Sequence, residues 1–532
     1  MKNKILWLLV SCLMVLSILM VSCTSPAVEE QEEKAAPEPE VSGKVIYGRL
    51  LAHWDFSEGD ILSQYGGGGL GIRSAISDSL IDKDHDAKIV PALAESWQFS
   101  NNGLTLEFTL RKGVKFHNGD PFTAKDVKFT LEMLMSEEKK SIYMSEMRRM
   151  IEDIEVVDDY HITIDTKTPY LSFLDHCYDY WGIVPKDYYE SVGAEEWAKH
   201  PVAAGPFKWV DYESDVFMEI EAVEDHYRHS PEFKTFRWVL VPEPSTLVAM
   251  LRTQEADLID VPAEFIEELD ADPDIRLSWA NDTSAAQLVF IDLLTMDEPL
   301  PFHDVRVREA ASLALDRATI CDKVLHGMGR PYRGSVAPWQ PGYDSELNKS
   351  DPYDPERARE LLAEAGYADG FDTKLHAVTS SKSTYEAIAA YLNEVGIRAE
   401  LVLADTGTHW QGHVVGKAPI GGLAQVVTTW SARAHTATSL DTMFNEKGAW
   451  CYVTLPEISA AVENMGKLMF GPELDAAASE VNQLIVDSKI RITLYASRGA
   501  TALGPRIEYY ERMAGHAYPA KFEYIRLKPE AK

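Results

Sequence analysis

The alternation of apolar and polar residues along the chain predicts both strands and amphipathic helices. Residues 44–51 and 103–110 are rich in strand-forming types, and the second stretch contains the alternating sequence Thr-Leu-Glu-Phe. A helix is expected to begin at Thr123, because its hydroxyl can cap free backbone amides and Asp126 lies at the positive end of the helix dipole. The body of the chain therefore combines the two kinds of element.

Residues 354–366 carry the signals of a complete helix. Asp354 supplies an N-cap, Pro355 fits the first turn, and Gly366 ends the pattern. The apolar positions repeat at helical spacing and form one face: Ala358, Leu361, Leu362 and Ala365. We expect this face to pack against a core.

A second helix is expected between two strands. Ser383 and Glu386 have the spacing of a capping box, and Gly396 is the predicted stop. The apolar side of this helix is Ile388, Leu392 and Val395. Residues 373–379 and 397–403 are predicted as strands, so the segment forms a βαβ unit whose crossover should be right-handed. At least one lobe is therefore expected to be α/β.

Residues 1–22 have the pattern of a secretory signal peptide. Lys2 and Lys4 precede an apolar run at 5–21, which is short for a membrane span. Ser22 is the small residue that a lipoprotein signal peptidase requires, so we expect cleavage before Cys23 and a lipid attached to Cys23. An uncleaved signal anchor is the alternative.

Residues 23–43 are expected to form a lipidated, flexible tether. Positions 24–40 contain six Glu, one Lys and three Pro, a composition too polar to build a core. The lipid on Cys23 would be the membrane contact and would hold the folded body near the outer face of a membrane. The predicted location is the cell envelope, on the outer side of the cytoplasmic membrane or in the periplasm.

Charge narrows the range of partners. Of 532 residues, 51 are Lys or Arg and 84 are Asp or Glu, which gives a formal net charge of −33. Such a surface repels phosphate backbones, so no nucleic acid partner is expected. Hydrophobic residues make up 45% of the chain, enough for several large cores, and the length predicts about three or four folding units.

Two short motifs imitate cofactor or metal sites and fail in detail. Gly66–Gly71 has the spacing of a dinucleotide-binding loop but lacks the preceding buried strand, so we expect a turn before a helix. Asp82, Asp84 and Asp86 imitate the start of a calcium loop, but Ala87 replaces the required glycine. We therefore expect a polar hairpin turn there, and no cofactor.

His409 and His413 have the spacing that places two imidazoles on one helical face, as at the start of zinc protease sites. The general-base Glu and a third ligand are missing, and no G-x-S-x-G or phosphate-loop motif is present. No catalytic residue and no metal site is therefore assigned. A metal-dependent hydrolase using His409 and His413 is kept as the alternative from a different class.

The cysteine residues allow few disulfide or metal-binding arrangements. Cys12 would leave with the signal peptide, and Cys23 would carry the lipid. Cys177, Cys321 and Cys451 remain, an odd number that permits at most one disulfide. No C-x-x-C pair is present, so a thiolate zinc site is not supported.

Longer sequence blocks are spread over nearly the whole mature chain. They are 91–97 (PALAESW), 110–119 (LRKGVKFHNG), 121–127 (PFTAKDV), 204–207 (AGPF), 301–310 (PFHDVRVREA), 314–317 (ALDR), 353–358 (YDPERA) and 361–367 (LLAEAGY). Together they resemble the signature of the family 5 extracellular solute-binding proteins, the oligopeptide and dipeptide receptors of ABC importers and their relatives.

The resemblance implies an α/β fold, a two-lobed periplasmic-binding-protein clamp that is type II-like and has an extra inserted subdomain in its first lobe. It implies a first-lobe core from 44–84, 200–275 and 491–532, an inserted subdomain at 85–199 and a second lobe at 276–490. Ligand contacts made by both lobes would favour a closed form, which then docks on the permease. A monomer is expected, and ATP hydrolysis would belong to separate subunits.

The resemblance also implies where a ligand binds. In peptide-binding members an aromatic residue upstream of a Trp-Thr-x-Asp segment helps to close the pocket, and the Asp pairs with the ammonium group of the peptide. Trp410 and Trp430 match the two aromatic positions, but Arg433 stands in place of the acid. Because arginine stays protonated and repels an ammonium group, a free α-amino terminus should not be bound there.

Arg433 has two interpretations. It either offers a fork to a ligand carboxylate or a hydroxyl-rich ligand, or forms a structural ion pair inside the second lobe. Trp410 fits core packing as well as ligand contact. His53 and Trp54 follow the first strand, where family members approach the ligand. With Trp410, Trp430, Arg433 and His435, they complete the expected ligand-binding set.

The sequence thus predicts an extracytoplasmic lipoprotein that captures a small solute by hinge closure and delivers it to the permease subunits of an ABC transporter. A peptide is the first choice of solute, and an oligosaccharide or carboxylate-bearing compound is the nearest rival. A surface adhesin or signalling receptor without transport is a third class. The protein is not expected to be an enzyme.

Overall fold

The structure is a computed structural model. It describes residues 43–50, 67–137, 142–169, 173–294, 300–340, 342–347, 349–405, 408–409, 421–429, 435–448, 451–513 and 519–531. None of the described helices is long and apolar enough to cross a membrane. The predicted signal peptide, the tether and Cys23 lie outside the described residues, so these assignments stay predictions.

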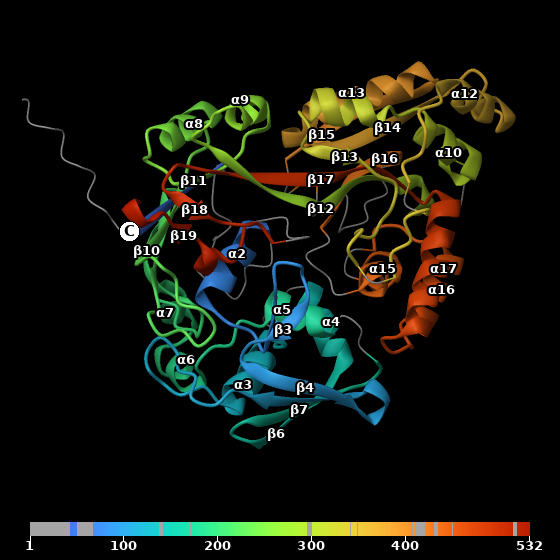
Figure 1. Ribbon diagram of the computed structural model, residues 1–532. Helices are drawn as coiled ribbons and strands as arrows, with labels where there is room; N and C mark the ends of the chain where they lie inside the picture. Colours follow the sequence, from blue (N-terminus) through green and yellow to red (C-terminus); the bar gives the residue numbers. More distant parts are fainter. Residues whose placement is uncertain are drawn as a thin grey trace, which may run out of the picture. The chain divides into compact units, whose positions relative to one another are not determined.

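An eleven-stranded mixed sheet is the main framework of the described chain (Figure 1). Its strand order is β15-β14-β16-β12-β17-β11-β1-β10-β9-β8, and β13 pairs with β17 off this path. The strands are β1 (Lys44–Arg49), β8 (Phe207–Glu213), β9 (Phe217–Ala222), β10 (Thr235–Leu240), β11 (Leu258–Asp260), β12 (Arg276–Phe290), β13 (Gly329–Pro331), β14 (Phe371–Val378), β15 (Ile397–Ala404), β16 (Leu423–Thr429) and β17 (Arg491–Leu503). Segments from both ends of the chain meet in it.

Three smaller sheets complete the strand inventory of the described residues. A four-stranded antiparallel sheet has the order β4-β5-β7-β6, and two two-stranded sheets pair β2 with β3 and β18 with β19. Their bounds are β2 (Ile81–Lys83), β3 (Ile89–Pro91), β4 (Ala94–Ser100), β5 (Thr105–Leu110), β6 (Ile151–Asp158), β7 (His161–Thr166), β18 (Ile507–Tyr509) and β19 (Arg526–Leu527). In β5, Leu106, Phe108 and Leu110 are buried in alternation with Thr and Glu, as the sequence pattern predicts.

Helices cover these sheets. They are α2 (Gly67–Ile76), α3 (Ala124–Leu134), α4 (Ile142–Met150), α5 (Phe173–Tyr180), α6 (Lys186–Val192), α7 (Ala194–Lys199), α8 (Pro244–Arg252), α9 (Ile266–Asp270), α10 (Val305–Leu313), α11 (Arg317–Thr319), α12 (Pro355–Glu364), α13 (Lys382–Glu394), α15 (Thr436–Phe444), α16 (Pro456–Met465) and α17 (Pro472–Ser488). Both helix and strand are therefore well represented, which agrees with the expected α/β class.

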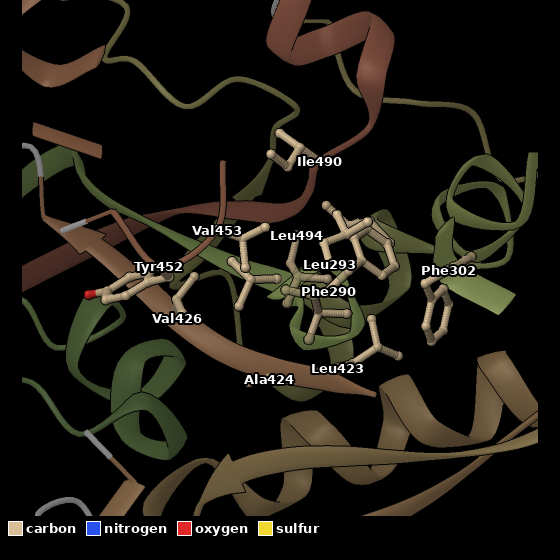
Figure 2. Close-up of a cluster of buried hydrophobic side chains, with 14 of the residues drawn as sticks. Phe290, Leu293, Phe302, Leu423, Ala424, Val426, Tyr452, Val453, Ile490 and Leu494 are labelled. Carbon is tan, nitrogen blue, oxygen red and sulfur yellow. The ribbon is translucent and has the colours of Figure 1, made fainter. Parts of the chain in front are cut away.

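Four large clusters of buried apolar side chains organise the molecule. The large core spans residues 286–494 and includes Phe290, Phe302 and Leu494 (Figure 2). The small-sheet core lies around β4–β7 and α3–α5. The terminal core combines 45–258 with 503–531, and the α8–α9 core includes Leu247 and Ile259. Each of the four names also denotes the part of the chain that is built on that cluster.

Several predicted elements form as expected. Asp354 caps α12 by accepting the backbone N–H of Arg357 at 2.9 Å, and Ala358, Leu361 and Leu362 are buried. Before α3, the Asp126 carboxylate accepts the backbone N–H of Thr123 at 2.9 Å, which satisfies an amide at the helix start. The strands β14 and β15 are parallel neighbours with α13 between them in sequence, so the βαβ unit is confirmed.

Two local predictions are wrong. Ser383 and Glu386 do not form a capping box, because α13 begins one residue earlier at Lys382, directly after the short 3-10 turn Thr379–Ser381. Glu386 instead lies 3.6 Å from the Lys382 ammonium group on the exposed side. The glycines at 67–71 do not form a turn before a helix but are the first residues of α2 itself.

The hairpin predicted around Asp84 is present. β2 and β3 pair antiparallel, and the Asp84 carboxylate accepts the backbone N–H groups of Asp86 and Lys88 at 3.0 and 2.9 Å. This carboxylate thus serves the turn, as expected for an aspartate at such a position.

Candidate functional site

The segment that precedes His53 and Trp54 is fixed by one carboxylate. Asp260, at the end of β11, accepts the Arg49 Nε–H at 2.8 Å and the backbone N–H of Leu50 at 3.1 Å. The strand β1 therefore ends at a defined point before these two residues. His53 and Trp54 lie outside the described residues, and their contact with a ligand stays a prediction.

The expected pocket segment is anchored at its two ends. At the upstream end His409 is buried, and its Nε2 donates to the carbonyl of Gln425 on β16 at 2.9 Å. At the downstream end β16 pairs with β12 up to Thr429, opposite Ser284. Trp410, His413, Trp430 and Arg433 lie outside the described residues. What these four residues contact stays a prediction. Their neighbours on the described chain are His409, which is bound to β16, and Thr429, which ends β16.

His435 is held inside the large core. Its Nδ1 accepts the backbone N–H of Ala437 at 3.0 Å and caps α15, so Nε2 carries the ring proton and donates to Asp475 at 2.8 Å. The His435 ring also lies edge-on to Phe470. Both ring nitrogens are thus used within the protein, and the histidine fixes the point where the 431–434 segment ends.

The metal-dependent alternative receives no support from the described part of the chain. Within those residues no three His, Cys, Asp or Glu side chains are grouped so that they could hold a metal ion. His409 uses Nε2 to bind the β16 backbone, and His413 lies beyond the described ranges. His409 therefore serves to attach the segment before Trp410 to the sheet.

The three cysteines among the described residues are buried. Cys177 belongs to the small-sheet core, while Cys321 and Cys451 lie in the part of the chain that builds the large core. Burial raises the pKa of the Cys321 thiol to about 12, since the thiolate would be poorly solvated there. No disulfide joins these three residues.

Two strands connect the large core to the α8–α9 core. β17 contributes Ile492 and Leu494 to the large core, and Ala500 and Ala502 to the α8–α9 core. β12 runs antiparallel to it, and their register shifts between Ala280 and Ser284, between the two cores. Figure 1 shows the pair running continuously from the α8–α9 side to the α12–α13 side. Both strands therefore pass from one core to the other, and a bulge interrupts their pairing between the two.

The small-sheet core is joined to the terminal core by two of the sequence blocks. The backbone N–H of His117 donates to Ala203 at 2.8 Å, and its Nε2 lies 3.0 Å from the carbonyl of Gly205. Burial lowers the pKa of His117 to about 4, and the Gly205 carbonyl opposes this only in part. The imidazole is therefore neutral at pH 7 and its Nε2–H donates to Gly205.

Buried ion pairs strengthen the same junction. Arg228 contacts Asp78 and Asp82 at 2.6 Å each, and Lys521, near the C-terminus, also contacts Asp82. Burial alone would raise the pKa of both aspartates, but Arg228 and the neighbouring cations outweigh it and hold both pKa values below the usual range. The neighbouring residue in β2, Lys83, pairs with Asp175 of α5 at 2.8 Å, so the network reaches into the small-sheet core.

The small-sheet core also touches the large core, without a shared strand among the described residues. A Cβ placed on Gly103 would lie 2.1 Å from the Sδ of Met469, so the two residues are in close contact. The guanidinium Nη1 of Arg149 donates to the carbonyl of Lys447 at 3.3 Å. These contacts join two parts of the chain that share no strand among the described residues.

Trp339 is a candidate that the sequence patterns did not identify. Its ring packs against both the small-sheet core and a small cluster of Ala285, Tyr332, Ala337 and Ala496 at the β12–β17 pair. Its Nε1–H is buried without a hydrogen-bond partner among the described residues. The sequence block near 339 (APWQPG) gave no periodic signal, and only tertiary structure shows that this indole lies between two cores.

Comparison with known proteins places the chain in a family. The model of the bacterial extracellular solute-binding proteins, family 5, matches residues 88–448. Heme-binding protein A of Haemophilus influenzae is 32% identical over 313 residues, which cover 55% of this chain and 56% of that protein. The glutathione-binding protein GsiB of Pectobacterium atrosepticum is 27% identical over 373 residues, covering 69% of this chain and 71% of that protein.

Solved structures show the same fold. The periplasmic binding protein DppA of Helicobacter pylori, in complex with the peptide STSA, superposes with a TM-score of 0.78 at 23% identity, covering 91% of this chain and 98% of that one. The fold is therefore the two-lobed clamp of periplasmic binding proteins, as the sequence predicted. The chain belongs to the bacterial extracellular solute-binding proteins of family 5.

Proposed function

We propose that the protein captures a small peptide by hinge closure and delivers it to the permease of an ABC importer. The observation that carries this proposal is the β12–β17 pair, which links two cores through a register shift between Ala280 and Ser284. Such a joint allows two bodies to close on a ligand that contacts both. The family supports transport, and a relative that binds glutathione, itself a short peptide, supports the class of solute.

The proposed lobes follow the sequence-based boundaries. The first lobe would comprise 44–84, 200–275 and 491–532, with 85–199 inserted, and the second lobe 276–490. In support, the terminal core draws on both chain ends, the small-sheet core lies mostly within 80–204, and the large core lies within 286–494.

The proposed ligand contacts are His53 and Trp54 from the first lobe, with Trp410, Trp430 and Arg433 from the second. His435 would act indirectly, because its capping of α15 fixes the end of the segment that carries Arg433. Arg433 would bind a ligand carboxylate through its two-pronged guanidinium. Trp339 extends this set, since its buried indole N–H is available at the junction of two cores.

The remaining proposals concern location. Lipidation of Cys23 after removal of residues 1–22 would retain the protein at the cell envelope as a monomer, on the outer side of the cytoplasmic membrane or in the periplasm. Mass spectrometry of the mature N-terminus tests this proposal directly. A lipidated cysteine supports it, and an intact Met1 contradicts it.

The peptide proposal is tested with synthetic tripeptide mixtures and isothermal titration calorimetry. We expect peptides with free carboxyl ends to bind, and Arg433→Met to weaken them about tenfold or more through loss of a charge-assisted bidentate contact. Blocking the α-amino group by acetylation should have a small effect. Loss of binding on acetylation, with no effect of Arg433→Met, would show that the ammonium group is the recognised end.

A further inference from the structure

A cavity of about 390 Å³ lies between the small-sheet core and the large core. One wall comes from the end of α4 and the residues after β7, and the other from the ends of α15 and α16. The charged residues that line it are Arg149 and Lys167 on the first wall, and Asp441, Lys447, Glu463 and Lys467 on the second.

Of the four cations that line this cavity, three have no carboxylate partner among the described residues. Lys447 lies 3.4 Å from Glu463 and is paired. No carboxylate of the described residues lies within 4.0 Å of the charged groups of Arg149, Lys167 or Lys467. Such a gathering is notable because the chain holds 84 acids against 51 bases.

The acids of the lining are already engaged. Glu463 faces Lys447, and the Asp441 Oδ1 accepts the Asn445 amide at 2.8 Å. The Arg149 Nη1 donates to the Lys447 carbonyl at 3.3 Å, and the Lys467 ammonium donates to the Asn464 side chain at 2.8 Å. Both are neutral acceptors, so they do not neutralise these cations. The Asn445 amide likewise leaves the charge of Asp441 in place, and the four cations and two carboxylates of the lining give a net charge of +2.

We propose that this cavity binds a carboxylate group, held by Arg149 and Lys167 from one wall and by Lys467 from the other. A guanidinium presents two parallel N–H groups to a carboxylate, and lysines act as point charges around it. Within a chain of net charge −33, a locally positive cavity is where such a group is retained.

Occupation of the cavity is coupled to closure. Its two walls belong to parts that meet at Gly103 and Met469, and at Arg149 and Lys447. A carboxylate that contacts both walls binds better when they are together, so it shifts the population toward that arrangement. The inference rests on the proposed function, because the carboxylate belongs either to the captured solute or to a free small anion that binds beside it.

The test compares three forms of the full mature protein. One is wild type and one is the double variant Lys167→Gln/Lys467→Gln. The matched control is Lys374→Gln/Lys382→Gln, which removes the same charge from two exposed lysines that do not line the cavity. Each form is titrated with a tripeptide mixture that has free carboxyl ends and with the same mixture amidated. Thermal unfolding is then measured with and without citrate.

A solute carboxylate and a free anion give different results. If the group belongs to the solute, the cavity and not Arg433 holds the solute carboxylate. Wild type and the control then bind the free-carboxyl mixture about tenfold more tightly than the amide, and the double variant loses this preference. If it is a free anion, amidation changes the affinity of all three forms by the same factor, because it acts through Arg433, and citrate raises the Tm of wild type and the control but not of the double variant.

The proposal is overturned if the double variant and the control behave alike in both assays, or if wild type responds to neither amidation nor citrate. Failure of the proposed function gives a separate result. In that case wild type binds no peptide of either mixture, while the citrate measurement still decides whether the cavity takes an anion.

Discussion

Gly103 of the small-sheet core lies against Met469 of the large core, so closely that a Cβ on Gly103 would lie 2.1 Å from the Met469 sulfur. Gly103 ends a turn in which Asn101 and Asn102 also have positive φ. The small-sheet core is tied to the terminal core by the Asp78, Asp82 and Arg228 ion pairs. The contact between Gly103 and Met469 is therefore expected only when the large core is closed on the rest of the molecule.

Gly103→Ala is expected to weaken solute binding without touching the solute. The new methyl group would meet the far end of the Met469 side chain, which is flexible and exposed and must move aside, so the closed arrangement loses this packing while the open one does not. We expect the dissociation constant of a bound tripeptide to rise about two- to threefold, since a loss of about 0.5 kcal/mol shifts a two-state equilibrium by that factor. Isothermal titration calorimetry measures it.

Gly113→Ala is the matched control. Its φ of +79° nearly equals the +82° of Gly103, but an added Cβ would meet nothing within 4 Å. It therefore carries the same backbone strain without the collision. Met469→Ala should restore affinity when combined with Gly103→Ala. Equal losses in the two alanine variants would mean that strain, and not the contact with Met469, sets the affinity.

Asp82→Asn is expected to lower the free energy of unfolding at pH 7 by about 3–5 kcal/mol, because it leaves the buried Lys521 ammonium without its carboxylate. Urea denaturation measures the loss. Asp86→Asn in the same hairpin is the control, since the Asp86 side chain is 77% exposed and should matter little. Indistinguishable urea midpoints for the two variants would contradict a stabilising role for the network.

The difference in stability between wild type and Asp82→Asn is also expected to depend on pH. The pKa of Asp82 is lowered in the folded protein: burial opposes this shift, but Lys521 and Arg228 outweigh burial. Its contribution is thus complete above the unfolded pKa of about 4 and is lost as the pH falls through the lower folded pKa. The difference in stability between wild type and Asp82→Asn should shrink below about pH 4. A constant difference across that range would contradict the assignment.

The buried imidazole of His117 is expected to give the free energy of unfolding a second, separate pH dependence. Burial lowers its pKa to about 4 in the folded protein, whereas in the unfolded chain the imidazole titrates near its usual pKa of about 6.5. The unfolded state binds more protons between these values, so stability should fall, by at most about 3 kcal/mol, as the pH decreases from about 6.5 to 4.

His117→Gln should remove this slope, and His161→Gln, with a side chain 47% exposed, should leave it unchanged. Free energies of unfolding between pH 4.5 and 7.5 test the prediction. An unaltered slope in His117→Gln would place the titrating group elsewhere.

Local capping and spacing predicted several elements because their causes lie within a few residues. Asp354 and Pro355 specify the start of α12 whatever the helix packs against. The capping pattern at Ser383 predicted the wrong start for α13, because that start depends on more than the nearest residues. The helix begins directly after a 3-10 turn that is continuous with the end of β14. The glycines at 67–71 are helical although glycine is a weak helix former, so tertiary structure must support α2.

The joints of the molecule could not be predicted from local pattern. His117 and Gly205 lie 88 positions apart, and Asp82 and Lys521 lie 439 positions apart, yet each pair is in contact. Nothing in either segment alone specifies such a partner. The family resemblance supplied the clamp, whereas the close contact of Gly103 with Met469 and the position of Trp339 between two cores required three-dimensional structure.

The central claim, closure on a solute that is not chemically changed, is tested by a distance measurement across the joint. Spin labels at Glu95→Cys and Glu473→Cys, both exposed sites, report the separation of the small-sheet core and the large core, and the native Cys177, Cys321 and Cys451 are buried. We predict a shorter distance when tripeptides are added, with intact peptide recovered by mass spectrometry. Bound peptide with an unchanged distance, or recovery of cleaved peptide, would contradict the account.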